Sequence, residues 1–131
     1  MTETATGISA IEQFDLTSEM DGFEQRRPWP SGLSSKTLIK TKELRMVLIA
    51  MDAGAKMQEH HTDGRICVQV LKGALQMRIQ QQTLSLTQGS LLTLERSIKH
   101  DVNAIEASAF LLTISWPTEQ ELRSMEHRGY A

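Results

Sequence analysis

The feature that most constrains this chain is a series of short apolar runs between residues 35 and 116. In the stretch ALQMRIQ, apolar Leu75, Met77 and Ile79 alternate with polar residues, and TLSLT repeats the pattern a few positions later. Alternation with a period of two places every second side chain on one face of a β-strand. The runs are roughly five to eight residues long, with turn signals every ~8–12 residues, as in β-sandwiches and barrels. The sequence therefore predicts an all-β domain over residues 35–116.

The two ends of the chain lack this alternation. Residues 1–34 are polar and contain the stretch RRPWPSG, whose prolines disfavour helix on both sides. We predict an irregular N-terminal arm that wraps around the domain, with Trp29 covering an apolar surface. Near the other end, the stretch TEQE has the spacing of a capping box. It predicts a short C-terminal helix and tail over residues 117–131.

Charge and cysteine content exclude several classes of protein. The 131 residues carry 14 basic and 16 acidic side chains, so electrostatics offers no reason to expect a nucleic-acid partner. The single cysteine, Cys67, excludes an internal disulfide and a cysteine-rich zinc site. No apolar run approaches the ~20 residues that span a bilayer, and the N-terminus lacks the pattern of a secretory signal. We therefore expect one cytoplasmic domain with no nucleic-acid or membrane partner.

The histidines are the residues that point most directly to chemistry. His60 and His61 precede one apolar run, and His100 follows another about forty residues later. Distant strands meet inside a small barrel, where imidazoles can supply part of the donor set of a divalent metal ion. Neighbouring residues on a regular strand point to opposite faces, so His60 and His61 serve one site only if an irregularity breaks the alternation.

The spacing around these histidines resembles that of the cupin superfamily. The stretch GAKMQEH, followed by a strand ending at Gly73, resembles the first cupin motif, and GSLLTLERSIKH, which ends at His100, resembles the second. The resemblance covers about residues 36–115. It implies a double-stranded β-helix, the jelly-roll barrel of the small single-domain cupins. It also implies that His60 and His100 occupy metal-ligand positions.

The chain departs from the cupin pattern at several positions. Counting back from the glycine that ends the first motif, the second family histidine falls on Thr62 and the family glutamate on Ile66. In the second motif, Glu95 and Ser97 replace a proline and a glycine. Loss of the glutamate removes charge that a hard cation needs, which makes Zn, Fe, Ni or Cu more favourable than Mg or Mn.

The residues leave three possible ligand sets open. In one register His60 lies in the first ligand position with Thr62 in the second, and in the other these positions hold Glu59 and His61. The second register would give Glu59, His61 and His100, a set that suits non-haem iron. A bulge near the turn could instead bring His60, His61 and His100 together, and we take these three histidines as the predicted metal ligands.

Two functions are consistent with this interpretation. The chain is expected to bind a divalent ion through the three histidines together with a small organic ligand, and a metal-dependent oxygenase or isomerase-like enzyme is consistent with such a site. The alternative is a non-catalytic module that binds or senses a small molecule without metal, which the lost glutamate favours.

Arginines and exposed surfaces suggest further roles. Arg65 and Arg78 are candidates for binding an anionic ligand, and Arg45 is expected to close one end of the barrel. A homodimer is expected, because Trp29 has no evident use inside a single barrel and an open sheet edge needs covering.

Overall fold

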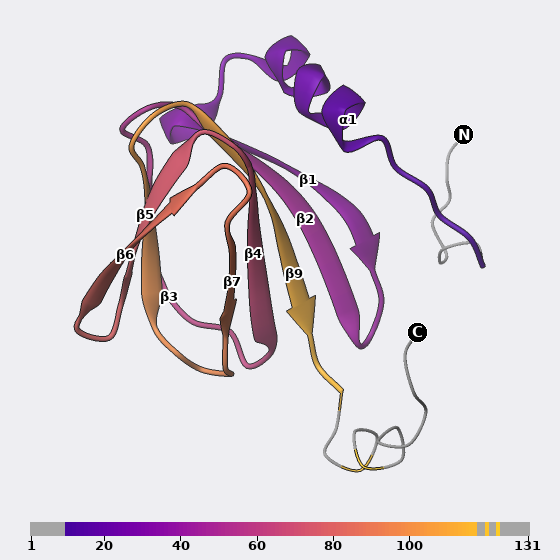
Figure 1. Ribbon diagram of the computed structural model, residues 1–131. Helices are drawn as coiled ribbons and strands as arrows, with labels where there is room; N and C mark the ends of the chain where they lie inside the picture. The colour runs from indigo at the N-terminus through magenta and orange to yellow at the C-terminus, as the bar shows by residue number, and fades with distance from the viewer. Residues whose placement is uncertain (1–9, 118–119, 121–122, 124–131) are drawn as a thin grey trace.

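The computed structural model describes residues 10–117, 120 and 123. Within these residues, nine strands form two antiparallel sheets that face each other (Figure 1). The first sheet has the order β1 (Leu33–Lys40), β2 (Leu44–Met51), β9 (Ser108–Ser115), β4 (Arg65–Lys72) and β7 (Leu91–Leu94). The second sheet has the order β3 (Lys56–His60), β8 (His100–Ala104), β5 (Ala74–Ile79) and β6 (Gln82–Thr87). The predicted all-β domain is confirmed.

Side chains from both sheets fill the space between them. In β5, the alternating residues Leu75, Met77 and Ile79 are buried, as the period of two predicts. The cluster between the sheets, called the inner cluster below, has these buried members: Ile49, Met51, Ile66, Val68, Val70, Leu75, Met77, Ile79, Leu86, Val102, Ala104, Phe110 and Ile114. The inner cluster therefore joins strands that are distant in sequence.

The central strands β2 and β9 are buried on both faces. Ile49 pairs with Phe110 on the side of the inner cluster, whereas Leu48 pairs with Leu111 on the outer side of the first sheet. This explains why the stretch MVLIAM at residues 46–51 is continuously apolar rather than alternating. A second layer must therefore cover the outer face of β2.

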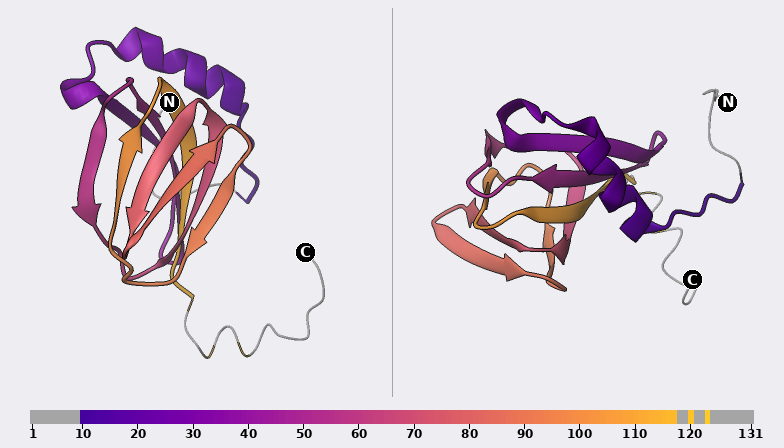
Figure 2. Two further views of the ribbon diagram at one scale, coloured as in Figure 1. Left: turned by 60° about the vertical axis from the view of Figure 1, so that its left-hand side comes forward. Right: turned by 90° about the horizontal axis from the view of Figure 1, so that it is seen from above.

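The N-terminal segment supplies that layer. It contains α1 (Leu16–Gly22) and two 3-10 turns, η1 (Phe23–Arg26) and η2 (Pro30–Gly32). The helix lies on the β1–β2 side of the molecule (Figure 2). Phe23 is 2% exposed and packs with Leu48, Ala50 and Leu111. The segment thus contributes a second hydrophobic cluster.

The expectation of an irregular N-terminal arm is wrong for α1. The carboxylate of Asp15 accepts a hydrogen bond from the backbone N–H of Ser18, as an N-cap does. A helix of seven residues is too short to show a clear 3.6-residue period. Packing of Leu16 and Met20 against the second cluster stabilises it instead.

Arg27 fastens the N-terminal segment to the barrel. Its guanidinium carbon lies 3.5 Å from the centre of the Trp29 ring, and its nitrogens form ion pairs with Glu24 and Asp52, both at 2.9 Å. The hydrogen bond from Arg27 lowers the pKa of the Asp52 carboxyl. Asp52 directly follows β2, so this contact joins the segment to the turn before β3.

Two further expectations concern the chain ends and membranes. The predicted C-terminal helix over 117–131 lies almost entirely outside the described residues. Among residues 10–117, 120 and 123, no helix has both the length and the apolar character required to cross a bilayer.

Candidate functional site at the histidine end of the barrel

His60 and His100 lie side by side at one end of the barrel. His60 is the last residue of β3 and His100 the first residue of β8, and the two are directly opposite each other in the strand pairing. Their ring centres are 4.3 Å apart with an interplanar angle of 61°. His100 is 4% exposed, whereas His60 is exposed at the rim. We call this end, where β3 ends and β8 begins, the histidine end.

A bulge in β3 decides which residue faces His100. Met57 pairs with Val102, and His60 pairs with His100, so β3 advances three residues while β8 covers two. Without this extra residue, Glu59 would lie opposite His100. Because Val102 and His100 lie two apart on β8, they share a face, and the bulge places His60 on that face as well. Of the registers that the sequence left open, the structure has the one with His60 opposite His100.

Glu59 does not lie beside His100, as the register that groups Glu59, His61 and His100 would require. It lines a polar groove of about 430 Å³ that also includes Gln76, Arg78 and Asp101. Gln76 and Arg78 alternate with the buried residues of β5, so this groove lies on the outer face of the second sheet. The structure therefore does not bring Glu59 and His100 into one group.

His61 and Thr62 belong to the turn that follows β3. His61 is exposed. The Thr62 hydroxyl accepts from the backbone N–H of Gly64 at 3.2 Å, and the Thr62 carbonyl accepts from the N–H of Ser97 at 2.8 Å. In the part of the chain that the structure describes, no three His, Cys, Asp or Glu side chains form a group that could hold a metal ion. The role of His61 as a third ligand stays a prediction.

Hydrogen bonds orient both imidazoles in the same way. Nδ1 of His60 lies 2.6 Å from the carbonyl oxygen of Gln58, and Nδ1 of His100 lies 3.0 Å from that of Ile98. A carbonyl oxygen only accepts, so in each neutral ring Nδ1 carries the proton and Nε2 keeps its lone pair. Metal-binding histidines commonly have this arrangement. Each of the two rings therefore has a nitrogen with a free lone pair, as a metal ligand requires.

The protonation of His100 is shifted in the direction that favours a free lone pair. Burial lowers the pKa of the His100 imidazole, and the nearby His60 lowers it further, while the hydrogen bond to Ile98 acts in the opposite direction. A neutral imidazole, rather than an imidazolium, is the form that binds a metal ion.

The wall opposite the histidines is apolar where the cupin pattern has a glutamate. Ile66 is 2% exposed and pairs with Ile114, and both belong to the inner cluster. His60 and His100 therefore offer two imidazole nitrogens at this end, and any further ligand would have to come from the predicted third histidine, His61, from water or from a bound molecule.

An apolar cavity of about 220 Å³ opens between β1, β2 and β3. It is lined by Leu33, Ser34, Ser35, Val47, Ile49 and Met57. Met57 lies on β3 just before the bulge, so the cavity adjoins the strand that carries His60. Its size and lining suit a small molecule with an apolar part.

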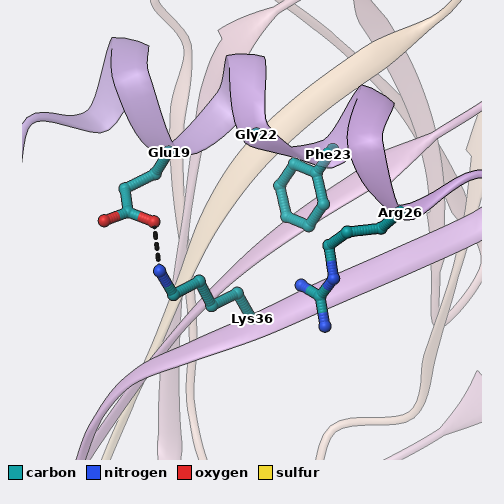
Figure 3. Close-up of a pocket in the computed structure, with 5 residues that line it drawn as sticks. All are labelled: Glu19, Gly22, Phe23, Arg26 and Lys36. Carbon is teal, nitrogen blue, oxygen red and sulfur yellow. Dashed lines mark hydrogen bonds and ion pairs between the residues drawn. The ribbon is translucent and has the colours of Figure 1, made fainter. Parts of the chain in front are cut away.

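A second cavity, of about 230 Å³, lies between α1 and β1 and is lined by Glu19, Gly22, Phe23, Arg26 and Lys36 (Figure 3). Lys36 forms an ion pair with Glu19, and Arg26 donates to the backbone carbonyl of Ser35 in β1. Its charged groups thus join the N-terminal segment to the edge strand β1, and we assign this cavity a structural role.

The arginines that sequence analysis singled out as anion ligands lie elsewhere. Arg78 forms an ion pair with Asp101 at 3.1 Å on the outer face of the second sheet. Arg65 is exposed and lies 4.0 Å from Glu95. Neither side chain is directed into the space between the sheets.

The arrangement of the strands defines the fold class. Two facing antiparallel sheets, with histidines meeting from two distant strands, form the double-stranded β-helix of the cupins. The chain has the cupin fold, as the spacing of its motifs implied.

Particular solved structures show the same fold. The chain is similar to a conserved protein of unknown function from Streptococcus pyogenes, with a TM-score of 0.68 and 23% identity over 89% of this chain and 97% of that one. It is similar to a cupin superfamily protein from Desulfitobacterium hafniense, with a TM-score of 0.63 and 15% identity over 65% and 78% of the two chains. It is also similar to KdgF from Halomonas sp., with a TM-score of 0.63 and 20% identity over 70% and 84%.

These identities establish the fold and nothing about activity. No protein-family model matches the sequence, and no curated protein matches it. The function must therefore be argued from the residues at the histidine end.

Proposed function

We propose that this protein binds a small organic ligand at the histidine end and that His60 and His100 hold a divalent metal ion there. The observation that supports the proposal is the ring pair at 4.3 Å, in which both Nδ1 atoms face carbonyl oxygens and both Nε2 atoms keep a lone pair. Two imidazoles without a carboxylate favour Zn, Fe, Ni or Cu over Mg or Mn. A bound ion would supply Lewis-acid polarisation of a ligand oxygen or activation of water.

The remaining roles belong to the chain itself. His60 and His100 would hold the ion through Nε2, because the carbonyls of Gln58 and Ile98 fix both ring tautomers. The apolar cavity next to Met57 would hold the body of the ligand and exclude water from it.

A second candidate function is ligand binding or sensing without metal. Ile66, buried where the cupin pattern has a glutamate, supports it, since two nitrogens are fewer donors than a stable zinc site has. In this case His60 and His100 would act as hydrogen-bond partners of the ligand.

Metal loading separates the two candidates. The purified protein is loaded in turn with Zn, Fe, Ni and Cu salts and dialysed, and the bound metal per chain is measured for the wild type and for His60→Ala, His100→Ala and His61→Ala. The two-histidine site predicts metal in the wild type and in His61→Ala, and loss in the other two variants. Loss in His61→Ala as well would support the three-histidine set instead. A wild type that retains none of the four metals would leave only the metal-free module.

A further inference from the structure

The first sheet carries a row of side chains that faces the histidine pair. Lys40 lies directly opposite Arg45, Arg45 opposite Ile114, and Ile114 opposite Ile66. Directly opposed residues in antiparallel strands share a face of the sheet. Because Ile114 and Ile66 belong to the inner cluster, Arg45 is also on the inner face, with Lys40 at the edge strand.

This row lies at the same end of the barrel as the histidines. The turn of residues 61–64 joins the end of β3 to the start of β4, where Ile66 lies, and residues 95–99 join the end of β7 to His100. Packed sheets are about 10 Å apart, a gap that an arginine side chain can largely cross. The histidine end therefore has imidazoles on one wall and a guanidinium on the other.

Arg45 has no acidic partner in the described part of the chain. Its Nε is buried without a hydrogen-bond acceptor, and neither Arg45 nor Lys40 forms an ion pair within residues 10–117, 120 and 123. Among the described residues, the guanidinium interacts with the ring of Trp116, whose centre lies 5.8 Å from Cζ. A buried N–H without an acceptor and two like charges directly opposite each other both destabilise a fold.

Two carboxylates in the adjoining turns accept hydrogen bonds from neutral donors. Asp63 accepts a hydrogen bond from Nε1 of Trp116 at 2.6 Å, and Glu43 accepts from the hydroxyl of Thr41 at 3.2 Å. Within residues 10–117, 120 and 123, no carboxylate pairs with the positive charge of Arg45 or Lys40, so this charge is open to a bound anion.

We propose that Arg45 binds the carboxylate of a small ligand at the histidine end and that Lys40 attracts it at the rim. This inference rests on the proposed function, because it names the ligand class of the same site. The planar guanidinium matches a carboxylate, and the neighbouring Ile66, Ile114 and Trp116 favour an apolar body over a sugar or a phosphate. The ligand is thus a monocarboxylate with an apolar part. Its carboxylate would also provide the negative charge that Ile66 does not.

The test uses benzoate and benzamide, which have the same shape and differ in charge. Binding to metal-free wild type is measured by titration calorimetry or by NMR shifts. We expect benzoate to bind at millimolar concentrations or below, with benzamide roughly tenfold weaker or more, since a charged hydrogen bond is lost. Arg45→Gln should weaken the binding of benzoate by a similar factor. Arg45→Lys should weaken it less, because it keeps the charge, and Lys40→Gln should weaken it modestly. Arg65→Gln is the matched control and should bind benzoate as the wild type does.

Several results would overturn the inference. These are equal affinities for benzoate and benzamide, undiminished benzoate binding by Arg45→Gln, and no benzoate binding by the wild type at millimolar concentrations. Benzoate binding that requires metal and survives Arg45→Gln would assign recognition to the ion instead, which also overturns it.

Two controls keep this test separate from that of the proposed function. Metal uptake is measured in Arg45→Gln, because a variant that loads metal but fails to bind benzoate supports both proposals. Arg45→Met should raise the urea midpoint above that of the wild type, since it removes an unpartnered charge. If Arg45→Gln does not fold, Lys40→Gln and the benzoate–benzamide comparison still decide the question.

Discussion

Gly73 provides a direct test of how tightly the turn between β4 and β5 packs. Its φ is +84°, in the left-handed region. A Cβ on Gly73 would lie 2.3 Å from the carbonyl oxygen of Ala107, 2.3 Å from Oγ of Ser108 and 2.8 Å from Cα of Ser108. Two of these atoms are backbone, so Gly73→Ala must displace the start of β9.

The hydroxyl of Ser108 would be displaced as well. It accepts from the backbone N–H of Ala74 at 3.0 Å and lies within hydrogen-bond distance of the carbonyls of Ala74 and Glu106. Ser108 is 4% exposed, so water cannot readily replace these bonds. Their loss would add about 1 kcal/mol or more to the cost of the substitution.

Gly54 is the matched control, because its φ is also +84° but a Cβ there would meet nothing within 4 Å. Gly54→Ala should cost ~1–2 kcal/mol, the penalty of a left-handed alanine. Gly73→Ala should cost about 3–5 kcal/mol, because overpacking adds ~1–3 kcal/mol and the bonds of Ser108 are disturbed. Both variants stiffen the unfolded chain equally, so the difference reports the contacts.

Urea unfolding, followed by tryptophan fluorescence and circular dichroism, measures both free energies. The two variants should have similar m-values and clearly different midpoints. Equal destabilisation by Gly73→Ala and Gly54→Ala would refute the contacts described here.

Three further predictions follow from the packing and the site. Phe23→Ala should lower the free energy of unfolding by about 3–5 kcal/mol. Phe14 lies outside both clusters, so Phe14→Ala should lower it much less. Equal losses of stability in urea unfolding would contradict the docking of the N-terminal segment. Because the folded state lowers the pKa of His100, the metal-free wild type should lose stability as pH falls below about 6.5. His100→Asn should flatten this dependence, and His61→Asn should do so much less, because His61 makes only a small contribution to the shift. Ile66→Glu should raise the affinity for zinc in metal titrations, and it should destabilise the metal-free protein by ~2 kcal/mol or more. An unchanged zinc affinity in a folded variant would place Ile66 away from the ion.

The homodimer stays a prediction, with one of its two supports removed. Trp29 does have a use within a single chain, since it packs on the second cluster and donates its indole N–H to the carbonyl of Phe23 at 3.0 Å. The second support remains, because the edge strand β1 pairs only with β2 in the described sheets. Measuring the oligomeric state in solution would test whether a second copy covers this edge.

Sequence alone determined the strands because their signal is local. In β5, the alternation of Leu75, Met77 and Ile79 predicts both the strand and the face that it buries. The relation between His60 and His100 across forty positions came from the resemblance of their motifs to those of the cupins, and the pairing of β3 with β8 places the two residues opposite each other. Helix α1 was missed because its stability comes from packing on the second cluster and not from its own seven residues.

Only the tertiary structure decided which side chains share the site. The bulge that places His60, and not Glu59, opposite His100 exists only in the pairing of β3 with β8. The position of Arg45 on the inner face of the first sheet, opposite Ile114, depends likewise on the register of β2 with β9. A pattern along one strand records which residues alternate, whereas the register between strands is set by pairing and packing over the whole barrel, and it is the register that assembles the site.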